Sequence, residues 1–171
     1  GYTAFTQQMD QDIIQNYHLM HVFSAGNSGT SNCNYGAGAG WGNITGGQKQ
    51  GKNVIAVANL QGTDAIAGSS SRGPAHDGRI KPDVVGSGIW LVSTWPDPPY
   101  YAAALGTSMA SPNVTGSLLL LQELVQPIAP TLKFLITLWL PLAFLPAAGL
   151  DGWLLMAGPL FVALSSQGGN A

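Results

Sequence analysis

The chain has 171 residues, of which 46% are hydrophobic and 8% are charged, and its formal net charge is −2. This length supports one domain with a hydrophobic core, and the high apolar share excludes a disordered chain. Only six residues are Lys or Arg, so we expect no nucleic-acid partner. Cys33 is the only cysteine, which excludes an internal disulfide and a cysteine-based metal cluster.

The first third of the chain predicts a helix and then a buried strand. Apolar residues recur at roughly helical spacing within residues 2–16, with polar residues between them. A short apolar run at residues 21–23 breaks at residues 24–29, which are Ser, Ala, Gly and Asn. A buried strand that ends in a loop has this pattern. Residues 28–53 are rich in Gly, Ser, Asn and Thr, which predicts a long surface loop.

The middle of the chain predicts further strands and a second helix. Residues 54–58 form another apolar run bounded by turn-forming residues, and residues 89–94 are a third candidate for a buried parallel strand. Residues 107–125 predict a helix that follows Gly106 and is apolar on nearly all faces, so we expect it to be buried between layers. Strands that alternate with helices indicate an α/β fold with a parallel sheet.

The composition becomes strongly apolar after residue 126. Residues 134–150 are 17 residues without a charge, close to the lower limit for a membrane span, which needs about 20. Pro141 and Pro146 would interrupt a continuous helix there.

Three interpretations of this tail stay open. It is a divergent, buried end of the preceding domain, a membrane-seeking segment that contacts lipid through residues 127–164, or sequence foreign to the fold, such as a shifted reading frame. We take residues 1–126 as one portion of a domain and residues 127–171 as a divergent apolar tail, the end of the same domain on the first interpretation.

The segment most informative about chemistry is residues 106–112, Gly-Thr-Ser-Met-Ala-Ser-Pro. Gly106 allows a sharp turn, and Ser108 then lies at the start of the predicted helix. A serine in that place is close to unpaired backbone N–H groups and to the positive end of the helix dipole. Such a site can stabilise the oxyanion of acyl transfer. The simpler alternative is that Thr107 or Ser108 only caps the helix.

This segment is similar to the nucleophile motif of the subtilisin-like serine proteases. Four more segments resemble segments of that family, in the family's order: residues 22–27 (VFSAGN), 53–57 (NVIAV), 69–74 (SSSRGP) and 81–84 (KPDV). The chain thus resembles the carboxy-terminal half of a subtilisin-like catalytic domain. The resemblance implies a partial doubly wound α/β fold, with a mostly parallel sheet and flanking helices.

The resemblance also implies roles for individual residues. Ser108 would be the nucleophile of a serine endopeptidase, and Asn27 would donate its side-chain amide to the developing oxyanion, together with the Ser108 N–H. The pocket for the residue before the cleaved bond would be lined by Ser24, Ala25, Gly26, Gly46 and Gly47. Asn and Gly are also common in ordinary turns, so a purely structural role is the alternative for Asn27 and for the glycines.

The other two members of a catalytic triad are not found by motif. A serine hydroxyl is a weak nucleophile until a base removes its proton, and in this family the chain order is Asp, His, Ser. His18, His21 and His76 all lack the Gly-Thr that follows the family's catalytic histidine. We interpret His21 as a packed strand residue and His76 as a solvated loop residue.

We therefore expect the triad Asp and His upstream of residue 1 and predict no useful proteolysis by this chain alone. The alternative function is a catalytically inactive fragment that binds a membrane or another protein. A serine esterase is remote, because Ala110 replaces the second glycine of Gly-x-Ser-x-Gly.

The resemblance implies a polypeptide substrate, no required cofactor and a secreted or cell-envelope location. The family often binds structural calcium, but calcium stays a family-level inference here, because no carboxylate cluster in the sequence places a metal. Residues 1–10 are polar and show no signal peptide.

Overall fold

The computed structural model describes residues 1–16, 19–125 and 135–139. The chain divides into two compact units. The first contains residues 1–89 and 105–140, and the described part of the second is residues 90–104. All the residues predicted for catalysis or substrate binding lie in the first unit.

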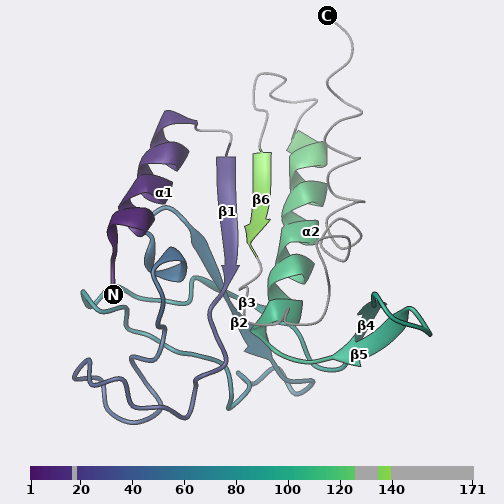
Figure 1. The fold of residues 1–171 in the computed structure, drawn as a ribbon, viewed down its shortest axis with the longest axis horizontal. Helices are drawn as coiled ribbons and strands as arrows, with labels where there is room; N and C mark the ends of the chain where they lie inside the picture. Colours follow the sequence, from purple (N-terminus) through teal and green to yellow (C-terminus); the bar gives the residue numbers. More distant parts are fainter. Residues whose placement is uncertain (17–18, 126–134, 140–171) are drawn as a thin grey trace, which may run out of the picture. The chain divides into compact units, whose positions relative to one another are not determined.

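A four-stranded parallel sheet forms the centre of the first unit (Figure 1). In spatial order its strands are β3 (Val84–Ser87), β2 (Ile55–Leu60), β1 (Leu19–Ser24) and β6 (Leu135–Trp139). Each neighbouring pair runs parallel, with Val57 opposite Val84, Val22 opposite Ile55 and Leu19 opposite Leu135. The predicted α/β fold with a parallel sheet is confirmed.

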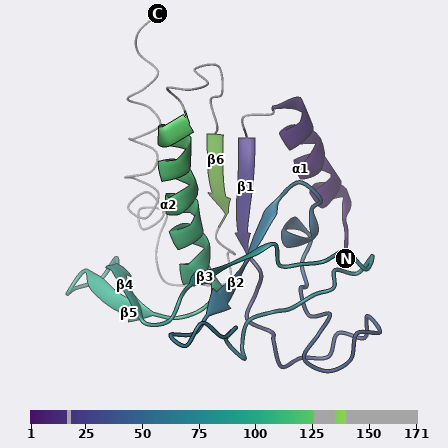
Figure 2. The ribbon, with the colours of Figure 1, turned by 180° about the vertical axis from the view of Figure 1, so that it is seen from behind.

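Two helices cover opposite faces of this sheet (Figures 1 and 2). Val22 packs in one apolar cluster with Ala110 of α2 (Thr107–Val125), whereas its neighbour Phe23 packs in a second cluster with Met9 of α1 (Ala4–Gln15). Successive side chains of a strand point to opposite faces. The sheet is therefore the middle layer between α1 and α2, as a doubly wound fold requires.

The predicted helix at the start of the chain is confirmed as α1. Thr3 caps its first turn, because its hydroxyl accepts from the Thr6 N–H while the Thr6 hydroxyl accepts from the Thr3 N–H. Asp10, buried on the inner side of α1, accepts hydrogen bonds from the backbone N–H groups of Lys52 and Asn53 at 2.9 and 2.8 Å. This carboxylate ties α1 to the loop that leads into β2.

The prediction of a third parallel strand at residues 89–94 is wrong. The third parallel strand is β3, and residues 91–94 instead form β4 (Leu91–Thr94), which pairs antiparallel with β5 (Tyr101–Ala104) in the second unit. Most of β4 is exposed, including Val92. β-Branched residues suit an exposed hairpin as well as a buried strand, so the composition of this short run does not separate the two.

Residues 28–53 are not simply a surface loop, as the sequence predicted. They contain the short 3₁₀ helix η1 (Gln48–Gln50), and the side chains of Asn43, Ile44 and Gln50 are fully buried. Asn43 donates to the carbonyl oxygens of Gly29 and Ser31 and accepts from the Arg72 N–H. Polar side chains that satisfy backbone groups can be buried, and a polar composition therefore hid this part of the core.

The helix at residues 107–125 is confirmed, but it is not buried on all faces. Val114, Leu118 and Leu119 pack against the sheet cluster. Leu120 and Leu124 on the other side are 69% and 67% exposed. A helix that covers one face of a sheet needs only one apolar stripe for that contact.

Part of the apolar tail belongs to the sheet. Residues 135–139 form β6, which does not fit a continuous helix through residues 134–150. The remaining predictions for residues 127–171 lie outside the described residues. Among the helices of residues 1–16 and 19–125, none combines the length and hydropathy needed to cross a membrane.

Candidate active site

The loop after β1 and the start of α2 meet at the carboxyl-terminal edge of the sheet. β1 ends at Ser24, and the Gly26 N–H then donates to the Thr107 hydroxyl at 3.2 Å. The Asn27 side-chain oxygen accepts from both the N–H and the hydroxyl of Thr107, each at 3.1 Å. These bonds join residues about 80 positions apart. The carboxyl edge of a parallel sheet is where α/β proteins bind ligands.

The bond from Thr107 fixes the orientation of the Asn27 amide. A backbone N–H is only a donor, so the atom that accepts from Thr107 must be Oδ1. The Nδ2 group then points away as a free donor, because no hydrogen-bond partner is found for it among the described residues. Asn27 is also exposed. Its amide can therefore donate to a group of a bound ligand.

Ser108 lies in the first turn of α2, next to this amide. Gly106, with φ of +134°, makes the turn into the helix, and its N–H is held by the Gly88 carbonyl oxygen after β3. A Cβ at Gly106 would lie 3.1 Å from Asn27 Nδ2, so the glycine is needed for both the φ and the close approach. The Ser108 N–H is among the first groups of a helix, which lack an internal partner.

The Ser108 hydroxyl is not held by any neighbour among the described residues. The residue is 5% exposed, and its hydroxyl has no hydrogen-bond partner within the described residues. The positive end of α2 favours negative charge at this point. The bonds between Thr107 and Asn27 hold the Asn27 loop beside the start of α2, and the Ser108 N–H, the Ser108 hydroxyl and Asn27 Nδ2 are the kinds of group that an acyl-transfer oxyanion site uses.

The residues predicted to line the substrate pocket separate into two groups. Gly26 and Gly46 are both close to the Lys49 side chain: a Cβ at Gly26 would lie 2.7 Å from Lys49 Nζ, and one at Gly46 would lie 3.4 Å from Lys49 Cε. Gly47 instead faces α1, because a Cβ there would lie 2.6 Å from the Thr3 hydroxyl. The need for glycine at position 47 is therefore explained by its close packing against the start of α1.

Ser24 and Ala25, the other two predicted lining residues, are buried at the end of β1. The Ala25 N–H donates to the Val57 carbonyl oxygen at 2.8 Å, which continues the pairing of β1 with β2. They hold the loop that carries Gly26 and Asn27.

Three functional candidates were missed by the sequence analysis: Thr107 as the bridge between Gly26 and Asn27, and Lys49 and Ser71 beside Gly26. A Cβ at Gly26 would lie 2.9 Å from Ser71 Oγ. The sequence held one indication of Lys49, because it is a cation two residues after Gly47, which was predicted to line the pocket.

No histidine of the described residues bonds Ser108. His21 is buried on β1, stacked on Phe23, and burial lowers its pKa. His76 is exposed in a loop and contacts Tyr35. Both agree with the packed-strand and solvated-loop interpretations, and His18 lies outside the described residues.

The described residues do not fit a metal site built on side chains. Among residues 1–16, 19–125 and 135–139, no three His, Cys, Asp or Glu residues lie close enough together to hold an ion. We assign no step of a mechanism to calcium.

Comparison with known proteins agrees with this geometry. The sequence pattern of the subtilase family, peptidase S8, matches residues 1–134. The chain belongs to the subtilase family. This match covers β1, the Asn27 loop and the whole of α2.

Individual subtilases and related structures extend the comparison. The chain is similar to the minor extracellular protease Vpr of Bacillus subtilis, with 42% identity in a 66-residue alignment that covers 35% of this chain and 8% of Vpr. Its fold is similar to that of the prenylagaramide maturation protease PagA, with a TM-score of 0.55 and 18% identity over 75% of this chain and 40% of PagA. It is also similar to the PatG macrocyclase bound to a peptide, with a TM-score of 0.52 and 17% identity over 71% of this chain and 32% of PatG. The chain spans less than half the length of each of these proteins.

Proposed function

We propose that this chain is the nucleophile-bearing part of a serine endopeptidase, with Ser108 as the nucleophile. The observation that carries the proposal is the pair of hydrogen bonds from Thr107 to Asn27 Oδ1, which holds the Asn27 loop against the residue before Ser108 and leaves Asn27 Nδ2 as a donor without a partner among the described residues. Membership of the subtilase family supports the same chemistry.

In the proposed reaction, Ser108 Oγ attacks the carbonyl carbon of a peptide bond and its proton passes to a base. The carbonyl oxygen becomes an oxyanion that accepts hydrogen bonds from the Ser108 N–H and Asn27 Nδ2. The base then returns the proton to the leaving amine, which gives an acyl-enzyme at Ser108. Water releases the acyl group by the reverse sequence.

The base and its orienting carboxylate are proposed to come from chain outside these 171 residues. His21 is an unsuitable base, because burial on the sheet keeps it from solvent and from Ser108. The 171-residue chain alone should then hydrolyse peptides at a background rate.

The proposed substrate is a polypeptide, and the proposed location is outside the cell, by analogy with the extracellular Bacillus relative.

The test is hydrolysis of an unfolded polypeptide by the complete protein that contains this chain. Ser108→Ala should reduce kcat about a millionfold; that magnitude was measured on subtilisin, itself a member of this family. Ser117→Ala is the matched control, a serine on the same helix whose hydroxyl donates to the Asn113 carbonyl oxygen. Equal activity in the two variants, or hydrolysis by residues 1–171 alone that depends on Ser108, would contradict the proposal.

A further inference from the structure

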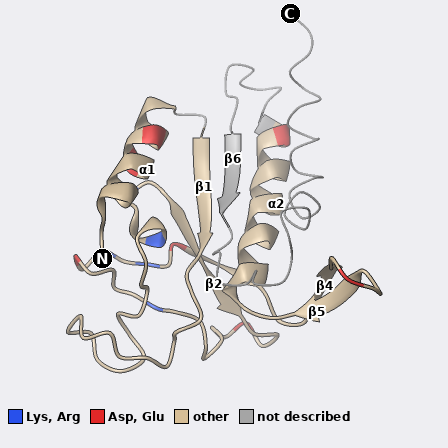
Figure 3. Cartoon of the chain, viewed as in Figure 1, with Lys and Arg blue, Asp and Glu red and all other residues tan. Residues whose placement is uncertain are grey.

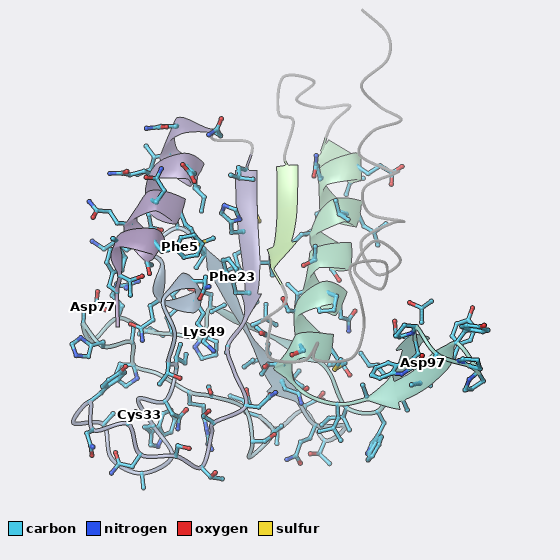
Figure 4. All side chains as sticks on the ribbon, in the orientation of Figure 1. Phe5, Phe23, Cys33, Lys49, Asp77 and Asp97 are labelled. Carbon is cyan, nitrogen blue, oxygen red and sulfur yellow. The ribbon has the colours of Figure 1, made fainter. Side chains whose placement is uncertain are left out.

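Lys49 presents an uncompensated positive charge beside the proposed active site. Its Nζ lies next to Gly26, whose N–H is bonded to Thr107, the residue before Ser108. Its methylene groups pass along Gly46. Figure 4 shows Lys49 near the carboxyl-terminal end of β1, below Phe23.

The charge on Lys49 has no partner in the described part of the chain. No hydrogen bond or ion pair reaches its Nζ there, and the side chain is only partly exposed. Burial lowers the pKa of Lys49, with no opposing interaction. A half-buried ammonium ion without a counter-ion is costly, so the structure offers an anion a favourable place.

Three carboxylates of the loops and of α1 are already engaged with other groups. Asp10 accepts from Tyr2 and from two backbone N–H groups, Asp77 pairs with Arg79, and Asp83 pairs with Lys81. The described basic residues all lie between residues 49 and 81, in the loops around the strand ends, whereas acidic residues also lie on α1 and α2 (Figure 3). The described part of the chain therefore supplies no counter-ion for the Lys49 ammonium group, and a bound ligand would have to supply it.

Ser71 provides a second donor at the same point. Its hydroxyl oxygen lies 2.9 Å, and Lys49 Nζ 2.7 Å, from where a side chain on Gly26 would begin. This hydroxyl accepts from the Ser28 N–H at 3.0 Å, which leaves its own proton to donate, and no acceptor is found among the described residues. A cation and a hydroxyl donor together match the two oxygens of a carboxylate.

The position of Gly26 connects these donors with the scissile bond. Gly26 precedes Asn27, whose amide is proposed to bind the carbonyl oxygen of that bond. The side chain of the substrate residue that carries this carbonyl branches from the Cα, which is bonded directly to the carbonyl carbon. Because Gly26 has no side chain, Lys49 Nζ and Ser71 Oγ can lie directly against its backbone, on the loop that carries Asn27, so a substrate side chain that packs on Gly26 meets both donors.

We propose that this site prefers an acidic residue, Glu or Asp, immediately before the cleaved bond, with Lys49 as the residue that binds its carboxylate. The inference rests on the proposed endopeptidase function and adds the substrate class. An apolar residue in that place would bury the ammonium ion further without a partner.

The test compares peptides that differ only at the residue before the cleaved bond: Glu, Gln, Leu and Lys. The complete protein should cleave the Glu peptide with a kcat/KM about 10- to 100-fold above that of the Gln peptide, the range of one charge-assisted hydrogen bond. Lys49→Met should remove this preference and raise cleavage after Leu, whereas Lys49→Arg should retain part of the preference. Lys52→Met, two residues away with its ammonium over the Tyr2 ring, is the matched control and should leave the preference unchanged.

The two proposals fail in different ways. Ser108-dependent cleavage after Leu, with a Glu-to-Gln ratio near one or unchanged in Lys49→Met, would overturn the acidic preference and leave the endopeptidase intact. Absence of Ser108-dependent cleavage of every peptide would overturn the proposed function and this inference with it.

Discussion

Two sets of polar side chains in this chain contrast in how their hydrogen-bonding groups are used. In the loops that support the sheet, Asn43 and Asp10 each satisfy several backbone groups. In the loops at the carboxyl-terminal edge of the sheet and at the start of α2, Asn27, Ser108 and Lys49 each keep a donor without a partner within the described residues. Buried polar groups are normally paired, so the fully paired Asn43 and Asp10 belong to the scaffold. In the described part of the chain, unpaired buried atoms also occur at His21, Asn59, Arg72 and Ser111; the donors of Asn27, Ser108 and Lys49 differ from these in lying together around Gly26 and Thr107.

The strongest test of this contrast is to substitute one asparagine from each set and compare the two variants. Asn27→Ala should lower kcat of the complete protein about 100- to 1,000-fold, or about 2.7–4 kcal/mol, because one oxyanion donor is lost; this magnitude was also measured on subtilisin. It also leaves the N–H and hydroxyl of the buried Thr107 without their acceptor, so the free energy of unfolding should fall by about 1–3 kcal/mol as well. Kinetics and chemical denaturation on the same samples measure both effects.

Asn43→Ala should lower the stability of the protein without lowering its kcat. It leaves the Gly29 and Ser31 carbonyl oxygens and the Arg72 N–H without their partner, which should cost about 3 kcal/mol of unfolding free energy. The protein that remains folded should keep its kcat. A large loss of kcat in folded Asn43→Ala, or an unchanged kcat in folded Asn27→Ala, would end the distinction between site and scaffold.

Asp10 tests the role of the scaffold through the pH dependence of its contribution to stability. Burial raises the pKa of this carboxyl, but hydrogen bonds from Lys52, Tyr2 and Asn53 outweigh it, and the net pKa lies below the usual 3.8. Asp10 therefore binds protons less readily in the folded chain than in the unfolded chain. Its stabilisation is present above the usual pKa and is lost as pH falls through the lower folded pKa.

Asp10→Asn should accordingly cost about 2 kcal/mol at pH 7 and progressively less toward pH 2. Asp12→Asn, on the same helix, is the control, because its carboxylate accepts from the Gln8 side chain at an exposed site. Denaturation at a series of pH values measures both. A cost for Asp10→Asn that does not vary with pH would show that its charge has no role.

The smallest effect is expected on the outer face of α2. Leu120→Ala should cost less than about 0.5 kcal/mol because Leu120 is exposed. Leu118→Ala, which removes a contact with the sheet cluster, should cost about 1–2 kcal/mol. Equal costs would mean that both faces of α2 are packed.

The same contrast explains how much of the molecule is predictable from its sequence. α1, β1, β2 and α2 follow from apolar periodicity, because each has a buried stripe or run. β3 was missed because it is only four residues long, and Val84 and Val85 in it are partly exposed. The hairpin strand β4 was misassigned because its apolar residues are exposed.

The site was predictable only where a motif carries it. Ser108 and Asn27 were named from such motifs, and the structure brings them together, whereas their catalytic roles stay predictions. Lys49 lies in a Gln-Lys-Gln run that has the composition of a surface loop. Its relation to Gly26 depends on the fold of residues 43–50, which is determined by the buried side chains of Asn43 and Gln50.

The central claim is that Ser108 is an activated nucleophile, and covalent labelling tests it most directly. The complete protein, treated with a fluorophosphonate and digested, should carry one phosphonate on Ser108, and Ser108→Ala should carry none while Ser117→Ala labels normally. A phosphonate on another serine, or no labelling of a protein that is shown to be folded, would contradict the claim.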